Sequence, residues 1–197
     1  MILIALAFMV LGVLCGQFWL DLPVETVDLS AKIALCVLVF SVGLDIGHNR
    51  EIFAHLKKMN IKVLLIPLGI VVGSLGGGVL VGMAFGFPFS IAGGISSGFG
   101  WYSLSAIMLN EMVSPQVGTI SFLVNVFREI MAILLIPLLA KYLNVYTAIA
   151  PAGATSMDTT LSFIKKYTNE EVAVIAVVNG VLLSALVPVF VTLFCGA

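Results

Sequence analysis

The chain has 197 residues, of which 61% are hydrophobic and only 10% are charged. A soluble domain carries about a quarter charged residues, so this chain has too little polar surface to fold as a globule in water. Its net charge of −1 gives no electrostatic basis for binding nucleic acid. The composition therefore predicts an all-α integral membrane protein with a single transmembrane domain over residues 1–197.

Five stretches have the length and hydrophobicity of membrane-spanning helices, which need roughly 20 apolar residues. They are residues 1–20, 31–47, 61–84, 117–140 and 172–195. Stretch 1–20 lacks the basic start and the small-residue cleavage site of a secretory signal peptide, so we interpret it as a spanning helix. The three cysteines lie far apart in apolar runs, which favours buried thiols over a metal or redox site.

Two further apolar stretches, 87–112 and 145–166, are interrupted by glycine and polar residues. The first contains SSGFGWYSLS (96–105) and the second contains PAGATS (151–156). Each leaves two half-helices of about ten residues, a length typical of re-entrant segments. We expect two re-entrant hairpins, because non-helical backbone inside a membrane must be buried in protein or line a water-filled cavity.

With these hairpins, the chain has three spanning helices in 1–84, followed by hairpin and helix twice, in 87–140 and 145–195. The second copy is inverted, which is a recurrent transporter design. The 48–62 loop carries four basic residues and the 21–30 loop carries three acidic ones. Positive loops face the cytoplasm, so we expect a cytoplasmic N-terminus and an external C-terminus. If both interrupted segments cross fully instead, Lys141 moves to the outside.

Ionisable residues within the apolar segments are candidates for function. Asp158 lies three residues after Thr155, the spacing of a capping box. Because a charge inside the membrane is costly, Asp158 is equally a candidate for cation binding or proton transfer. Arg128 and Glu129 interrupt helix 117–140 and point about 100° apart, so each needs a partner elsewhere. Arg128 can pair with Asp158, keep Glu129 ionised or hold a substrate carboxylate.

The other candidate substrate-binding residues lie at the two hairpin tips and in the long helices. Trp101 and Tyr102 are expected to line a pocket, where a tryptophan ring can stack on an ammonium group. Gly98 and Gly100 allow close backbone approach. Polar side chains complete the set: Ser96, Ser97, Ser103, Asn125, Thr155, Ser156 and Asn179. Asp45 and Glu111 are weaker candidates, and we expect no cofactor or metal.

Four motifs in register resemble the lysine exporter family of the LysO type. They are SGFGWYSLS (97–105), REIMAILLIPLLAKY (128–142), GATSMDTTL (153–161) and VNGVLLSALVP (178–188). Ser162 departs from this resemblance, because a proline is expected after MDTTL. The resemblance covers the C-terminal two-thirds of the family pattern, so we expect the larger piece of a split exporter.

This resemblance implies a transporter of the inner membrane and not an enzyme. The expected activity is export of L-lysine, and of analogues such as thialysine, in exchange for protons. The resemblance further implies that Glu129 and Asp158 are essential to antiport. Lysine and protons would then compete for these carboxylates while the hairpins gate alternately. Expected partners are the lipid bilayer and a second copy of the chain, or a small N-terminal subunit.

Two other functions stay open at this point. Asp45 and Asp158 can be read as the dyad of an intramembrane protease, although Asp45 lies towards the cytoplasmic end of its helix. The chain can also be read as an accessory or scaffold subunit that needs an N-terminal partner for transport.

Overall fold

The computed structural model describes residues 61–196 continuously, together with isolated helical residues between positions 11 and 44. The chain divides into two units, Met1–Leu38 and Val39–Ala197, and residues 61–196 belong to the second. The predicted helices 1–20 and 31–47 lie outside the continuous part, as do Asp45 and most of the 48–62 loop.

Three helices of the described part are long and apolar enough to cross a membrane. They are α4 (Leu65–Ala84), α7 (Pro115–Tyr142) and α9 (Glu170–Cys195). The 3₁₀ turn η1 (Ile61–Leu64) precedes α4. These helices coincide with the predicted stretches 61–84, 117–140 and 172–195, and all regular structure in residues 61–196 is helical. The prediction of an all-α membrane protein with several spans is supported.

Local capping explains why α7 and α9 begin slightly before their apolar stretches. The Ser114 hydroxyl accepts a hydrogen bond from the Val117 amide at 3.4 Å, and Pro115 occupies the first turn of α7. At the start of α9, the Asn169 side chain accepts from the Val172 amide at 3.0 Å. Two glutamates follow in the first turn, where negative charge favours the helix N-terminus.

The first interrupted segment has the expected pair of half-helices, and the second does not. Helices α5 (Phe89–Ser96) and α6 (Tyr102–Met112) flank the first break. Stretch 145–166 instead contains two 3₁₀ turns, η2 (Thr147–Ile149) and η3 (Gly153–Met157), before the short helix α8 (Leu161–Tyr167). The expected first half-helix of 145–166 is therefore wrong. Pro151 lacks an amide donor, and Gly153 has a left-handed φ of 63°, so a regular helix cannot continue there.

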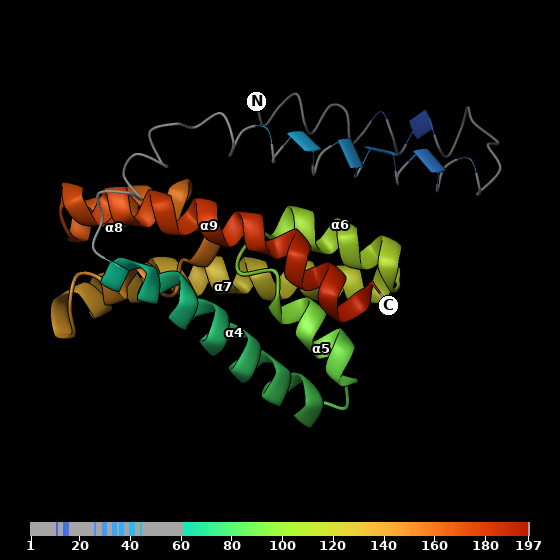
Figure 1. Ribbon diagram of the computed structural model, residues 1–197, viewed down its shortest axis with the longest axis horizontal. Helices are drawn as coiled ribbons and strands as arrows, with labels where there is room; N and C mark the ends of the chain where they lie inside the picture. Colours follow the sequence, from blue (N-terminus) through green and yellow to red (C-terminus); the bar gives the residue numbers. More distant parts are fainter. Residues whose placement is uncertain are drawn as a thin grey trace. The chain divides into compact units, whose positions relative to one another are not determined.

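The interrupted segments lie against the two long helices α7 and α9 (Figure 1). Helices α6 and α8 each contact both α7 and α9, whereas α7 and α9 have few direct contacts. Helix α4 packs mainly against α5. Over the most apolar 18 residues of each helix, 56% of α9 is buried, against 11% of α4 and 17% of α7. Helix α9 is thus the central helix of this unit.

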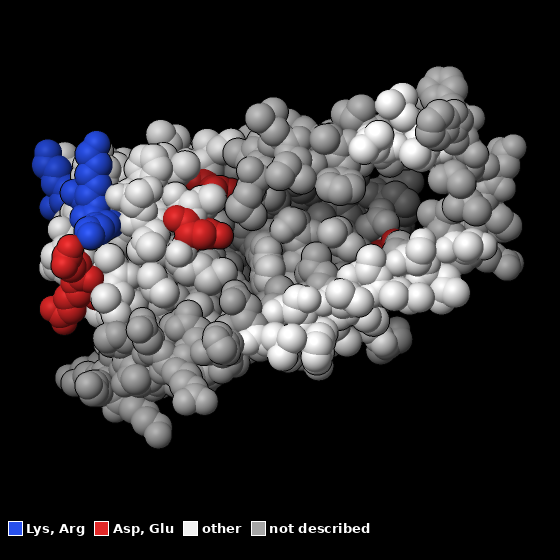
Figure 2. Space-filling model, turned by 90° about the horizontal axis from the view of Figure 1, so that it is seen from above, with Lys and Arg blue, Asp and Glu red and all other residues white. Residues whose placement is uncertain are grey.

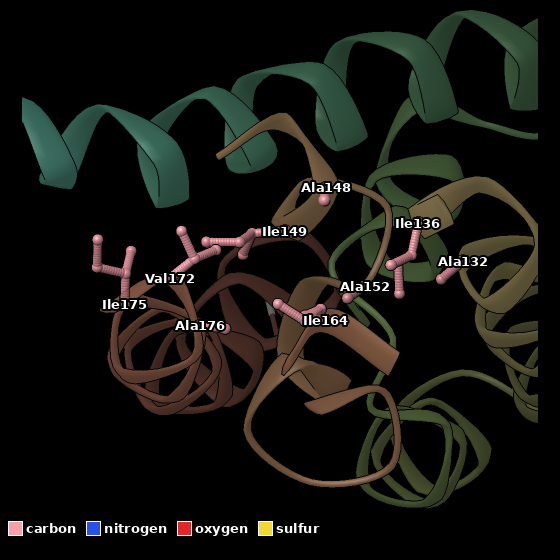
Figure 3. Close-up of a cluster of buried hydrophobic side chains, with 9 residues drawn as sticks. All are labelled: Ala132, Ile136, Ala148, Ile149, Ala152, Ile164, Val172, Ile175 and Ala176. Atoms are coloured by element: carbon pink, nitrogen blue, oxygen red, sulfur yellow. The ribbon is translucent and has the colours of Figure 1, made fainter. Parts of the chain in front are cut away.

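A cluster of buried aliphatic side chains joins the second interrupted segment to the long helices (Figure 3). It combines side chains of α7, η2, α8 and α9 and fixes the irregular chain of 147–160 on both sides. Its members are Ala132, Ile136, Ala148, Ile149, Ala152, Ile164, Val172, Ile175 and Ala176.

Charged side chains concentrate where α8 ends and α9 begins. Lys165, Lys166, Glu170 and Glu171 are all exposed there, and Figure 2 shows charged groups gathered at one end of the visible face. The Lys165 ammonium and the Glu170 carboxylate form a 2.9 Å ion pair. An exposed pair of this kind contributes little to stability.

Candidate functional site

The two interrupted segments meet through their main chains. We call residues 97–101 the first tip and residues 151–158 the second tip. The Ala154 amide donates a 2.8 Å hydrogen bond to the Phe99 carbonyl. Left-handed backbone lies on both sides of this contact, at Phe99 (φ 45°), Gly100 (φ 102°) and Gly153 (φ 63°). A Cβ on Gly153 would collide with the Phe99 carbonyl, so the close approach requires glycine.

Asn125 on α7 holds the first tip. Its side-chain oxygen accepts from the Gly100 amide at 2.8 Å, and its Nδ2 donates to the Ser121 carbonyl at 2.9 Å. The side chain is 2% exposed. A Cβ on Gly98 would collide with this amide. Asn125 therefore replaces the helical hydrogen bonds that the broken backbone has lost.

Asn179 on α9 holds the second tip, but as a hydrogen-bond donor, whereas Asn125 accepts from the first tip. Its Nδ2 donates to the Gly153 carbonyl at 3.1 Å and to the Ser156 hydroxyl at 3.0 Å. Ser156 in turn can donate to the Gly153 or Ala176 carbonyl, at 2.8 and 2.7 Å. Asn179 is 1% exposed. Both asparagines thus act on the main chain of a tip.

A small cavity of about 110 Å³ lies where the tips meet, and we call it the tip cavity. Residues of both tips and of α9 line it: Gly100, Trp101, Tyr102, Ser103, Ala154, Thr155, Met157, Asp158, Thr159 and Ser184. The exposed Asp158 carboxylate accepts a 2.5 Å hydrogen bond from the Thr159 amide. The cavity therefore combines one carboxylate, two aromatic rings and several hydroxyl groups.

A larger cavity of about 590 Å³ lies between α4, α7 and η2, and we call it the Arg128 groove. Its lining residues are Leu65, Ile66, Gly69, Ile70, Gly73, Ser74, Arg128, Leu139, Tyr146, Thr147, Ala150 and Pro151. Arg128 donates from Nε to the Pro151 carbonyl at 3.2 Å and from Nη1 to the Ser74 hydroxyl at 2.8 Å. Arg128 thus connects α7 to α4 and to the second tip.

Two structural alternatives for the charged residues are wrong. Asp158 does not cap a half-helix, because α8 begins after Thr160 and has no side-chain cap. Arg128 does not pair with Asp158, because its hydrogen bonds go to Pro151 and Ser74 while Asp158 lines the other cavity. Within residues 61–196, Lys165 and Glu170 form an ion pair, and Arg128 and Asp158 do not.

Several candidate residues lie away from both cavities. Glu129 is half-buried and lines neither of them. The hydroxyls of Ser96 and Ser97 donate to the carbonyls of Ala92 and Gly93, both at 2.6 Å, which satisfies them within α5. Glu111 lies in a separate cavity of about 450 Å³ near the ends of α6 and α7.

Three polar residues that line the cavities were not predicted from the sequence: Ser74, Thr147 and Ser184. Ser74 had a detectable signal, because it is a polar residue within the glycine-rich part of an apolar helix. Thr147 had none, because a threonine within the apolar stretch 145–166 is not unusual. In the part of the chain that the structure describes, no three His, Cys, Asp or Glu side chains can share a metal ion.

Comparison with known proteins identifies the family. Residues 6–195 match the family described as Lysine exporter LysO. Lysine exporter LysO of Escherichia coli (strain K12) is 34% identical over 165 residues, which are 84% of this chain and 54% of that protein. A Haemophilus influenzae protein named "Putative lysine exporter" is 36% identical over 191 residues, covering 94% of this chain and 91% of that protein.

This chain therefore spans about half of the E. coli relative and most of the H. influenzae one. No solved structure matches it. The family match covers nearly the whole chain, and it includes both tips and all three long helices. The chain belongs to the LysO family of lysine exporters.

Proposed function

We propose that this chain forms the transport site of an exporter that moves L-lysine, and analogues such as thialysine, outward in exchange for protons. The observation that carries the proposal is the tip cavity. There the main chains of two broken segments meet beside Asp158, Trp101 and Tyr102. Irregular backbone at membrane depth is tolerated where it builds a site.

The tip cavity suits an ammonium group. Asp158 supplies negative charge, Trp101 supplies an aromatic face, and the hydroxyls of Ser103, Thr159 and Ser184 supply acceptors. Its volume of about 110 Å³ equals the share of about three to four waters in the liquid. This is room for one end of lysine, so the remainder of the substrate must extend beyond the cavity.

Competition for carboxylates provides the coupling. A carboxylate at this site binds either an ammonium group or a proton, so entry of one favours release of the other. Asp158 lines the tip cavity, and Glu129 lies on α7 next to Arg128, which donates to the second tip. We assign proton coupling to these two residues.

The inverted repeat provides the gate in this proposal. The two asparagines support it, because Gly100 and Asn125 are 25 residues apart and Gly153 and Asn179 are 26 apart. Each long helix thus holds the tip of the preceding broken segment. Alternate movement of the two interrupted segments then exposes the site to each side of the inner membrane, with the N-terminus in the cytoplasm and the C-terminus outside.

The transporting unit is proposed to be a homodimer, or a complex with a small N-terminal membrane subunit. Large apolar side chains on α4 support a further contact or lipid on that face, since Leu68 and Leu80 are 62% and 71% exposed. Crosslinking in the membrane, with and without the subunit, distinguishes the two assemblies.

Lysine counterflow into proteoliposomes that contain only this chain tests the function. Exchange of labelled lysine that a pH gradient accelerates is the expected result. Lysine binding without exchange would instead identify an accessory subunit that needs a partner. Absence of both binding and exchange would refute the assignment of lysine.

A further inference from the structure

The Arg128 groove contains hydrogen-bond donors and a positive charge that have no role in the proposed binding of ammonium groups and protons. We infer that it is a carboxylate-binding subsite, in which Arg128, Ser74 and Thr147 receive the carboxylate of an aliphatic ligand. The identification of that ligand with the exported amino acid rests on the proposed function. The carboxylate site itself rests on the geometry of the groove.

Arg128 uses only some of its N–H groups in hydrogen bonds to residues 61–196. A guanidinium group carries five N–H donors. Nε donates to the Pro151 carbonyl and Nη1 to the Ser74 hydroxyl, and the structure gives Nη2 no hydrogen bond to residues 61–196. Nη2 lies 3.2 Å from the position that a Cβ on Gly153 would occupy, so it faces the second tip. A carboxylate that enters the groove can accept from the unused N–H groups.

The charge of Arg128 is also uncompensated within the described part of the chain. Both of its hydrogen-bond partners are neutral, and no aspartate or glutamate of residues 61–196 lines the groove. A cation against apolar walls is stable only with a charge partner or an extensive hydrogen-bond network. A carboxylate supplies the opposite charge and matches the planar guanidinium with two oxygens.

Thr147 provides a second donor. It lines the groove, and its hydroxyl oxygen is buried without a hydrogen-bond partner among the described residues. Rotation about its Cα–Cβ bond exchanges the hydroxyl with the methyl group, and no existing hydrogen bond is lost. The Ser74 hydroxyl accepts from Arg128, which leaves its own proton free to donate. Three side chains with hydrogen-bond donors, from α4, α7 and η2, thus line this one cavity.

The walls of the groove select the body of the ligand. Leu65, Ile66, Ile70 and Leu139 give it an aliphatic lining. The chain runs directly from Pro151 at the groove to Asp158 at the tip cavity. For lysine, the carboxylate would be recognised in the groove and the side-chain ammonium beside Asp158 in the tip cavity.

Binding of small probes to the purified full chain tests this inference. The probes are L-lysine, cadaverine (lysine without its carboxylate), hexanoate and decanoate, measured by calorimetry in detergent. The variants are Arg128→Gln and Thr147→Val, with Thr192→Val as the matched control, because Thr192 is an exposed residue of α9. We expect Arg128→Gln to weaken carboxylate binding at least tenfold and Thr147→Val to weaken it three- to tenfold. Cadaverine binding and the Thr192→Val protein should be unchanged.

The same measurements identify the source of the carboxylate and keep the two proposals separate. Lysine binding that is sensitive to both variants supports an amino-acid ligand, whereas sensitivity of decanoate alone supports a fatty acid. Carboxylate binding without lysine exchange would retain the subsite and refute the transport function. If Arg128→Gln does not fold, Thr147→Val alone tests the subsite. This substitution removes a hydroxyl that has no hydrogen-bond partner among the described residues. Equal affinities of both variants and the wild type for every carboxylate would overturn the subsite.

Discussion

The amide of Ala154 donates to the carbonyl of Phe99 at 2.8 Å, which joins two segments that are far apart in the sequence. Each segment is broken at this point and each is bound to a different long helix through an asparagine. The contact leaves no space for a side chain, as the position of Gly153 shows. The junction is therefore built from main-chain groups, and the neighbouring side chains are not needed to form it.

Replacement of Gly153 by alanine should destabilise the protein. Alanine at this position would have to adopt a φ of 63°, which residues with a Cβ disfavour. Its Cβ would also collide with the Phe99 carbonyl. The left-handed conformation alone costs roughly 1–2 kcal/mol. Thermal unfolding in detergent measures the loss. Gly76→Ala is the control, because Gly76 is helical with no described atom within 4 Å of its added Cβ. An unchanged Tm for Gly153→Ala would show that the tips are not held as described.

Replacement of Asn179 by aspartate should weaken the second tip. The substitution removes the donor to the Gly153 carbonyl and places an oxygen against it in a fully buried position. Loss of such a hydrogen bond costs about 1–3 kcal/mol. Asn144→Asp is the matched control, since exposed Asn144 uses only its oxygen to accept from the Thr147 amide. Similar unfolding temperatures for the two variants would contradict the role of Asn179.

Replacement of Asp158 by asparagine should abolish proton-driven lysine exchange. The amide can no longer bind a proton in competition with an ammonium group. Glu129→Gln should have the same effect, and exposed Glu171→Gln at the start of α9 should leave exchange intact. The measurement is labelled lysine counterflow with and without a pH gradient. Gradient-driven exchange by Asp158→Asn at the wild-type rate would exclude Asp158 from coupling.

Replacement of Trp101 by alanine should weaken lysine binding without removing it. Trp101 lines the tip cavity together with Asp158, and a ring over an ammonium group contributes about 0.5–2 kcal/mol, or roughly 2- to 30-fold in affinity. Trp101→Phe should lose less. Phe85→Ala is the control, because that side chain is 80% exposed at the end of α4. Calorimetric titration with lysine compares the three variants. Equal affinity in Trp101→Ala and wild type would remove the aromatic contact from the site.

The sequence by itself determined the membrane class, the three long helices of the described part and the positions of both breaks. Hydrophobic length and the glycine and proline residues at the breaks encode these features locally. The sequence also indicated the family through four motifs in register, which the comparison confirmed.

Tertiary structure alone decided which side chains meet. Spacing suggested that Asp158 caps a helix, but the chain around Gly153 forms 3₁₀ turns and leaves that carboxylate in the tip cavity. Opposite charge suggested that Asp158 pairs with Arg128. In the structure the Arg128 guanidinium instead donates to the Ser74 hydroxyl of α4 and to the Pro151 carbonyl of the second tip. Asn125 and Asn179 reach the tips over 25 and 26 residues. Such contacts depend on how helices pack, and local sequence spacing does not encode them.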